Sequence, residues 1–303
     1  MTNQNKNNLN PNFVTGFADG ESSFLINITP RPKTKTGYYI SLAFKIKLHS
    51  KDRALLENIR NYFGQVGTIT VRKDGYIEYI VASIKDLEVI INHFASYPLI
   101  TQKRSDYQLF KQVFELIKHK EHLTMEGLKK TLSIKAVLNN GLSDQLKAAF
   151  PDIAPVERPK FDVPEIVDLN WLVGFTEAEG CFFVKISKSK TTNSGFVIQL
   201  KFKVTQHSRD AELMNKLGYF FGCGFYYARP KESVGDFAVT RINEIIDKII
   251  PFFDKYPLQG AKALDYSDFR KIAYLMKDRV HFTVEGIEQI QQIKSGMNTG
   301  RNR

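Results

Sequence analysis

The sequence predicts an α+β protein built from two similar domains related by a pseudo-twofold axis, each with an antiparallel β-sheet and helices on one face of it. The first observation is an internal repeat: residues 12–64 align without a gap with residues 170–222, at an offset of 158. The second is the spacing of apolar residues, which alternates with period two in some segments and follows a helical pattern in others. A chain of 303 residues, 43% of them hydrophobic, can bury a core in each domain.

The repeat continues along most of the chain. FKIKLHSKD at 44–52 is matched by FKVTQHSRD at 202–210, and HLTMEG at 122–127 is matched by HFTVEG at 281–286, at an offset of 159. Units of about 130 residues are far longer than solenoid repeats, which favours a duplicated domain.

We expect an N-terminal domain at 1–142, a linker at 143–168 and a C-terminal domain at 169–303. The linker should hold no helix or central strand across its prolines, because each proline lacks an N–H donor. These prolines are Pro151, Pro155, Pro159 and Pro164.

Each half should contain, in order, a helix, two strands, a helix, two strands and further helices. The apolar stretches FVTGFADGES (13–22) and WLVGFTEAEG (171–180) form the first helix of each half. Ser50 and Ser208 occupy positions typical of helix N-caps. The later strands are expected at about 66–83 and 225–241, and the later helices at about 85–95, 104–119, 124–138, 243–254, 263–277 and 283–294.

The first helix of each half combines glycines with an acidic end. The small residues alone fit a closely packed helix seam. Packing explains Glu21 and Glu179 less well, because a buried carboxylate is costly unless it is paired or bound to metal. Brought together by a pseudo-twofold axis, these two glutamates would repel each other, and a divalent cation would relieve that repulsion.

The charge of the chain indicates a polyanionic partner. A formal charge of +11 and a pI near 9.4 favour nucleic acid first and an acidic membrane surface second. Apolar runs are too short to span a membrane, and the Asn-rich start has neither a signal core nor a transit-peptide pattern. Cys181 and Cys223 are too few for a disulfide framework, so a reducing compartment fits best.

The two stretches FVTGFADGES and WLVGFTEAEG, with the matched flanks HSKD/HSRD, YPL and KHKEHLT, resemble the paired motif helices of monomeric LAGLIDADG homing endonucleases. The similarity is strongest to the fungal mitochondrial, intron-encoded group typified by I-OnuI and I-SmaMI. It implies a monomer whose two sheets form a saddle in the major groove of double-stranded DNA. It also implies mitochondrial localisation.

The resemblance further implies a metal site and a reaction. Glu21 and Glu179 would bind Mg²⁺ with help from the carbonyls of Gly20 and Ala178, and Mn²⁺ or Ca²⁺ could occupy the same site. Such enzymes hydrolyse both strands of a long, nearly asymmetric target across the minor groove and leave short 3′ overhangs. Gln199 matches a polar residue at the centre of related sites and is predicted to support catalysis.

Two positions depart from the family pattern. Ser22 stands where most relatives have glycine, so the first helix could end with a different geometry. Tyr227 occupies the position of a lysine that polarises the site in relatives, and Arg229, Lys231 or Lys201 could replace it. The earlier acidic residues of the motif, Asp19 and Glu177, are open to a catalytic or a merely structural interpretation.

Side chains on the uncovered face of each sheet, and in the basic hairpin loops, are predicted to contact DNA, because alternate strand residues can reach base edges. In the first half these are Ser23, Asn27, Thr29, Arg31, Lys33, Lys35, Ser41, Lys45, Lys47, Thr68, Thr70, Arg72 and Glu78. In the second half they are Lys185, Ser187, Lys188, Ser189, Lys190, Gln199, Lys201, Lys203, Thr205, Tyr227, Arg229, Lys231 and Arg241.

Two other functions remain open from sequence. A maturase would use the same saddle to hold host intron RNA, and a cleavage-impaired protein would bind specific DNA without cutting it. The duplicated histidines, His49 with His207 and His122 with His281, lack the spacing of a metal or nuclease site, and a structural role is expected for them.

Overall fold

The computed structural model describes residues 9–302 apart from 167 and 193, and its chain divides into two compact units with a boundary after Val163. The first unit contains α1 (Pro11–Glu21), β1 (Ser22–Pro30), β2 (Tyr38–His49), α2 (Arg53–Tyr62), β3 (Thr68–Val71), β4 (Tyr76–Val81), α3 (Ile84–Ser96), α4 (Lys103–Lys118), α5 (Met125–Lys135) and α6 (Asp144–Ala149). Residues 1–8, where the sequence predicts no targeting signal, lie outside the described part.

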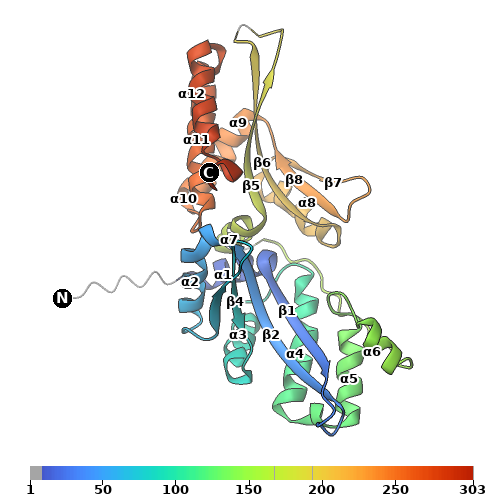
Figure 1. Cartoon of the computed structure of the whole chain (residues 1–303). Coiled ribbons are helices and arrows are strands. Elements are labelled where there is room, and N and C mark those ends of the chain that lie inside the picture. The colour runs from blue at the N-terminus through green and yellow to red at the C-terminus, as the bar shows by residue number, and fades with distance from the viewer. Residues whose placement is uncertain (1–8, 167, 193, 303) are drawn as a thin grey trace, which may run out of the picture. The chain divides into compact units, whose positions relative to one another are not determined.

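The second unit repeats this order of elements (Figure 1). It contains α7 (Leu169–Glu179), β5 (Gly180–Lys188), β6 (Phe196–His207), α8 (Ala211–Phe221), β7 (Phe225–Ala228), β8 (Val234–Val239), α9 (Ile242–Glu244), a π-helical stretch (Ile245–Ile249), α10 (Ile250–Lys255), α11 (Lys262–Lys277) and α12 (Val284–Ser295). None of the described helices is long and apolar enough to cross a membrane.

Each unit has one four-stranded antiparallel sheet. The strand orders are β1-β2-β4-β3 and β5-β6-β8-β7, so the two units share one topology. Helices contact one face of each sheet, as Figure 1 shows for α4 and α11, which pack against β1 and β5. The predicted α+β fold of two similar domains is confirmed.

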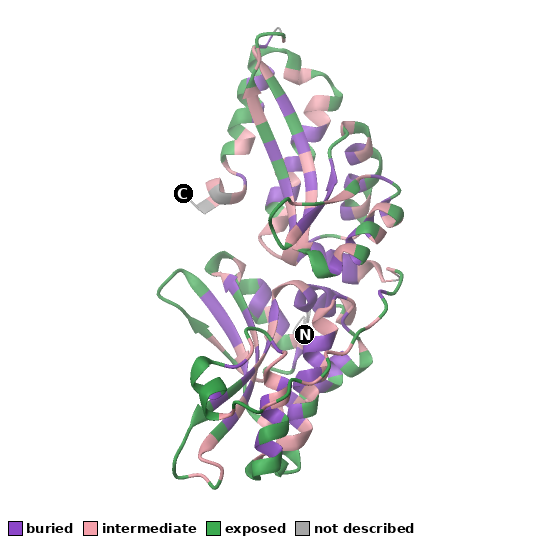
Figure 2. Cartoon of the chain, turned by 90° about the vertical axis from the view of Figure 1, so that its right-hand side faces the viewer, coloured by how far each residue is buried: buried purple, intermediate pink, exposed green. Residues whose placement is uncertain are grey.

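Alternation along the strands separates a core face from an outer face (Figure 2). On the core face Phe24 is fully buried and lies at the centre of an aromatic cluster with Phe44, Phe94, Tyr107 and Phe110. The second unit repeats the cluster around Phe182, with Phe202, Phe253, Tyr266 and Phe269. Helices therefore cover one face of each sheet, and the other face carries polar and charged side chains together with some exposed apolar ones.

The helix starts after β2 and β6 differ from the prediction. Ser50 and Ser208 begin short 3-10 turns instead of capping a helix. The caps are His49 and His207, whose Nδ1 atoms accept hydrogen bonds from the backbone N–H groups of Lys51 at 3.2 Å and Arg209 at 3.1 Å. Capping explains why this histidine pair recurs, and it supports the structural role expected for both residues.

Part of the segment expected as a linker, 143–168, is helical. Ser143 caps α6, which ends at Ala149 before Pro151, and residues 153–166 form no helix or strand. Arg158 ties this stretch to the first unit: its Nη2 atom lies 2.6 Å from the Asp106 carboxylate, and its Nη1 atom donates to the Val137 carbonyl. Arg158 therefore holds this part of the segment against the first unit.

Candidate active site and nucleic-acid interface

The C-terminal ends of α1 and α7 are each held by a lysine from the start of a later helix. Lys103 Nζ donates to the carbonyl oxygens of Ala18 at 3.0 Å and Gly20 at 2.7 Å. Lys262 Nζ donates to those of Thr176 at 3.1 Å and Ala178 at 3.2 Å. A helix C-terminus carries partial negative charge, so an ammonium group is favourable there.

The earlier acidic residues of the two motifs fix the same helix ends. Asp19 is buried and accepts hydrogen bonds from the backbone N–H groups of Ile100 at 2.9 Å and Thr101 at 3.1 Å. Glu177, also buried, accepts from those of Gln259 at 2.8 Å and Gly260 at 3.1 Å. Both carboxylates therefore stabilise the loops before α4 and α11, which favours the structural interpretation of Asp19 and Glu177.

Ser22 does not alter the end of its helix. The cap residues Ser22 and Gly180 have nearly the same backbone angles, φ −85° with ψ 161° and φ −78° with ψ 154°. A Cβ at Gly180 would lie 2.5 Å from Cγ2 of Thr176, whereas Ala18 stands at the equivalent place in α1 and lacks that methyl group. Ser22 instead donates to the Ala18 carbonyl at 2.7 Å. The two sequence differences compensate each other.

Glu21 and Glu179 are the last residues of α1 and α7, and both are half-buried. Gln206 Nε2 lies 3.4 Å from Glu179 Oε1, so within this unit Gln206 rather than Gln199 contacts the glutamate. Gln199 is exposed on β6 and pairs with Lys185, several residues along the strand from Gly180. The part of Gln199 in catalysis stays a prediction.

The atoms at these helix ends suit a hard divalent cation. Each end offers a carboxylate and an outward carbonyl, and oxygen ligands of this kind are those that Mg²⁺ and Ca²⁺ prefer. The carbonyls of Gly20 and Ala178 each accept one hydrogen bond from a lysine, and a carbonyl oxygen has a second lone pair that could bind a cation. Among the described residues, no group of three or more His, Cys, Asp or Glu side chains forms a metal cluster.

The outer face of the first sheet gathers most of the strand residues predicted to bind DNA. Cross-strand register places Ser23 opposite Lys45, Asn27 opposite Ser41, and Glu78 opposite both Lys47 and Thr70. Thr29 and Thr68 occupy the same face by alternation, whereas Arg31 and Arg72 follow the ends of β1 and β3. Glu78 is buried on this face, in ion pairs with Lys45 and, at 3.6 Å, with Arg72 Nε.

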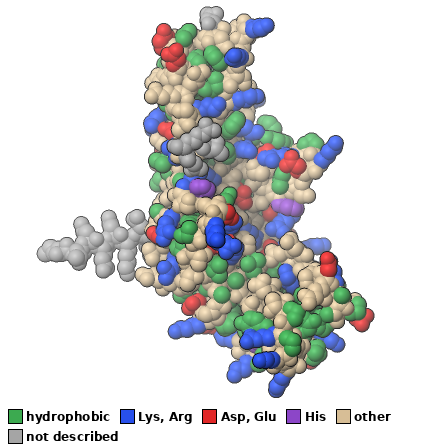
Figure 3. Space-filling model, in the orientation of Figure 1, with side chains coloured by type: hydrophobic (Ala, Val, Ile, Leu, Met, Phe, Trp, Pro, Cys, Tyr) green, Lys and Arg blue, Asp and Glu red, His purple; other side chains and the backbone are tan. Residues whose placement is uncertain are grey.

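The outer face of the second sheet is arranged in the same way. Lys185 pairs with Gln199, Ser187 with Val197, and Thr205 with Asp236, which in turn pairs with Tyr227. Lys201 Nζ donates to the Tyr227 hydroxyl at 2.5 Å, so the lysine proposed as a replacement does contact the tyrosine. Lys203 lies 4.0 Å from Asp236 Oδ1. Figure 3 shows many Lys and Arg side chains on the face in view.

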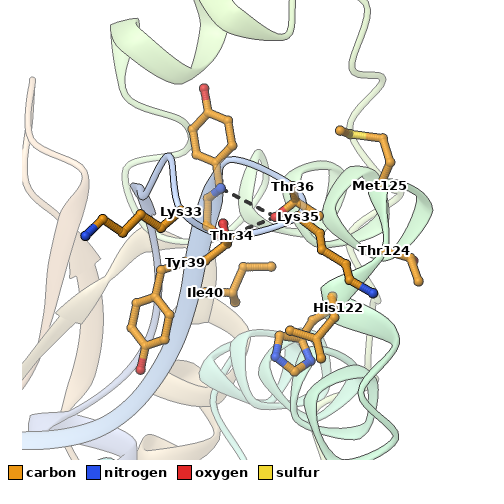
Figure 4. Close-up of a pocket in the computed structure, with 11 residues that line it drawn as sticks. Lys33, Thr34, Lys35, Thr36, Tyr39, Ile40, His122, Thr124 and Met125 are labelled. Carbon is orange, nitrogen blue, oxygen red and sulfur yellow. Dashed lines mark hydrogen bonds between the residues drawn. The ribbon is translucent and has the colours of Figure 1, made fainter.

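The hairpin loops hold the remaining predicted residues. The side chains of Lys33 and Lys35 point in opposite directions from the β1–β2 loop (Figure 4). Both residues line a cavity of about 670 Å³, and Lys35 extends towards the side lined by His122 and Thr124. Lys188 ends β5, and Ser189 and Lys190 follow it in the next loop. Lys231 lies in the β7–β8 turn, whereas Arg241 lies beyond β8, 3.3 Å from Glu244.

Sequence reasoning missed three features of these sites. Lys103 and Lys262 recur at the offset of 159, which was the available signal. Asp236 matches Glu78 at the offset of 158, and the prediction of Glu78 on the outer face of the first sheet was the available signal. Exposed apolar residues share the outer face of the second sheet, namely Phe183, Val197 and Phe225.

Comparison with known proteins places the chain in a family. The pattern of the LAGLIDADG endonucleases matches residues 14–114 and 172–273. Probable intron-encoded endonucleases 2 and 3 of Neurospora crassa are 41% and 40% identical to the chain over 95% and 93% of its length. The chain spans only 65% and 53% of the length of these two proteins.

Solved structures are similar along nearly the whole chain. The homing endonuclease I-SmaMI bound to cleaved DNA has a TM-score of 0.95 and 41% identity, covering 97% of this chain and 98% of its own. I-LtrWI bound to target DNA has a TM-score of 0.93 and 42% identity, covering 98% and 99%. I-SmaMI was also solved on uncleaved target DNA with calcium ions, at a TM-score of 0.94 and 41% identity over 96% and 99%. The chain belongs to the LAGLIDADG endonuclease family.

Proposed function

We propose that the chain is a monomeric, site-specific homing endonuclease that hydrolyses both strands of a long, nearly asymmetric DNA target across the minor groove and leaves short 3′ overhangs. The observation that carries this proposal is the pair of duplicated helices ending in Glu21 and Glu179, each next to a carbonyl held by a lysine. Two ends that differ in sequence but agree in geometry fit two equivalent catalytic sites, one for each strand.

The proposed reaction needs a divalent cation, with Mg²⁺ as the physiological ion and Mn²⁺ or Ca²⁺ as alternatives. Glu21 and the Gly20 carbonyl would hold a cation at the end of α1, and Glu179 and the Ala178 carbonyl would hold one at the end of α7. A cation bound there would activate water and stabilise the leaving oxygen of a phosphodiester. Lys103 and Lys262 fix the carbonyls, and their charge would also attract the phosphate backbone. A relative solved with calcium on uncleaved DNA supports the choice of ion class.

Sequence would be read by the outer faces of the two sheets. Arg and Lys side chains there suit guanine, Asn and Gln suit adenine, and apolar side chains suit the thymine methyl group. The loop lysines Lys33, Lys35, Lys188 and Lys190 would bind phosphates on the flanks. Similarity to DNA-bound I-SmaMI and I-LtrWI supports double-stranded DNA as the partner.

The gene would lie in a fungal mitochondrial intron, and the protein would act in mitochondria. The support is that the Neurospora crassa relatives are named intron-encoded endonucleases. The reducing compartment expected from two cysteines is compatible with this location.

A DNA library tests the proposed function. The purified protein is incubated with a randomised plasmid library in Mg²⁺ or in EDTA, and cut ends are sequenced. We expect one family of related targets, cut on both strands with 3′ overhangs, only in Mg²⁺. Cutting without sequence preference, or cutting that persists in EDTA, would refute the proposal.

A further inference from the structure

Asp236 is a buried carboxylate on a face that is otherwise basic. It projects from β8 on the outer side of the second sheet, yet it is only 3% exposed. Its Oδ2 atom accepts from Arg229 Nε at 2.8 Å, and its Oδ1 atom accepts from Arg229 Nη2 at 2.8 Å and from Thr205 Oγ1 at 2.5 Å. Both oxygens are thus occupied, and Asp236 is poorly placed to accept from a base.

The contact orients the guanidinium group of Arg229. Asp236 uses the edge formed by Nε and Nη2, at 2.8 Å for each nitrogen. On the terminal edge, formed by Nη1 and Nη2, Nη2 also donates to Thr205 Oγ1 at 3.5 Å, and this longer contact can give way to a stronger acceptor. Nη1 also lies 3.3 Å from Glu232, whose side chain is 55% exposed and can move aside. A terminal edge held in one plane matches the two acceptors of guanine, O6 and N7.

The carboxylate is charged under the conditions in which DNA is bound. Burial alone would raise the pKa of Asp236, but hydrogen bonds from Arg229 and Thr205, with the charge of Lys203, outweigh burial and lower the pKa to about 2. The hydrogen bonds that Arg229 donates to Asp236 in turn raise the pKa of Arg229. The contact between Asp236 and Arg229 is therefore a stable ion pair near neutral pH. Because this pair already fixes the Arg229 side chain, little further conformational entropy is lost when DNA binds.

The first unit carries a looser contact of the same kind at the matching position, a single ion pair of 3.6 Å between Arg72 Nε and Glu78 in place of two hydrogen bonds. Glu78, at the offset of 158 from Asp236, is buried on the outer face and pairs with Lys45 and Arg72. Arg72 and Arg229 each follow the short third strand of their sheet. A negative charge on this face weakens the attraction to the DNA phosphates, so DNA binding alone would disfavour an acid there. A buried acid next to a basic side chain in both units therefore points to a role beyond stability.

We infer that Asp236 is a positioning residue that presents the terminal edge of Arg229 to one guanine of the target, and that Glu78 does the same for Arg72 at another base pair. This inference rests on the proposed function, because it assumes that the outer faces contact DNA. It assigns selectivity to two acids that would not themselves touch the bases. Substituting either acid should change which base is accepted at a single position, although the substitution adds net positive charge.

The test measures the relative cleavage of target libraries with all four bases at each position. The wild type should prefer guanine at one base pair of the half-site read by the second sheet, by roughly 5- to 150-fold. R229Q should abolish that preference, and D236N should reduce it at least several-fold while other positions keep theirs. E232Q is the matched control, because it also removes one negative charge next to Arg229, but from an exposed side chain. It should leave the selectivity unchanged. Circular dichroism melts check that the variants are folded.

E78Q gives an independent test in the other unit, since it should relax selectivity at a different base pair. Selectivity unchanged by both D236N and E78Q would overturn the inference, as would an equal loss at every position. A wild type that cuts no specific target would instead refute the proposed function. The two failures are therefore distinguishable.

Discussion

Replacing Gly180 with serine tests how the end of α7 is built. A Cβ at this position would lie 2.5 Å from both Cγ2 and the carbonyl oxygen of Thr176, and Thr176 is fully buried. Forced overpacking of this kind costs about 1–3 kcal/mol. In α1 the same turn accepts Ser22 because Ala18 has no γ-methyl group. T176A/G180S would therefore reproduce in α7 the pair that α1 already uses.

The assay is a double-mutant cycle on the free energy of unfolding in urea. T176A alone should cost about 1 kcal/mol for the lost methyl group. G180S should cost about 2 kcal/mol alone and much less in the T176A background, for a coupling energy of about 1–2 kcal/mol. The mirrored pair A18T and S22G in α1 is the control and should couple with the same sign. Additive effects in both cycles would refute the steric account of the helix ends.

Three further predictions concern groups that stabilise the individual units. K103M and K262M should each lower the free energy of unfolding by about 1–2 kcal/mol, because each removes two hydrogen bonds from a helix end; urea midpoints measure this loss. Burial lowers the pKa of His93 to about 4, below its ordinary 6.5, so the imidazole is protonated more readily in the unfolded chain. The contribution of the neutral imidazole to the free energy of unfolding should be fully present above pH 6.5 and should fall by up to about 3 kcal/mol as the pH drops towards 4. H93Q should flatten that profile, and an unchanged profile would exclude His93 as its cause. R158A should lower the free energy of unfolding by about 2 kcal/mol, and by less where D106N is already present, because only the hydrogen bonds to the Val137 and Gln102 carbonyls then remain to be lost.

Much of the fold could be predicted because its information is local or repeated. Alternation along 196–205 is strong, and β6 indeed buries Ile198, Leu200 and Phe202 on one side. The repeat then supported each assignment twice. Boundaries were less predictable where short polar residues compete for a cap, as at His49 and Ser50, since a histidine ring can also accept the first backbone bond.

Contacts between distant segments could not be predicted from one sequence. Lys103 lies far along the chain from Gly20, and only the folded unit shows that the two meet. The fit of Ser22 with Ala18 is a local contact, but the sequence alone does not show that these two side chains compensate each other, so a different helix end was expected. Asp236 was missed although its counterpart Glu78 was predicted, because its hydrogen bonds with Arg229 become visible only in the folded unit.

The glutamates at the ends of α1 and α7 are the central claim, and separating binding from cleavage tests them most directly. On the target selected from the library, E21Q and E179Q should bind within a few-fold of the wild type, because the outer faces of the sheets are unchanged. Double-strand cleavage by each should fall by at least about 100-fold, since losing a carboxylate ligand weakens the proposed cation site. Cleavage of both strands at a rate near that of the wild type by either variant would contradict the account.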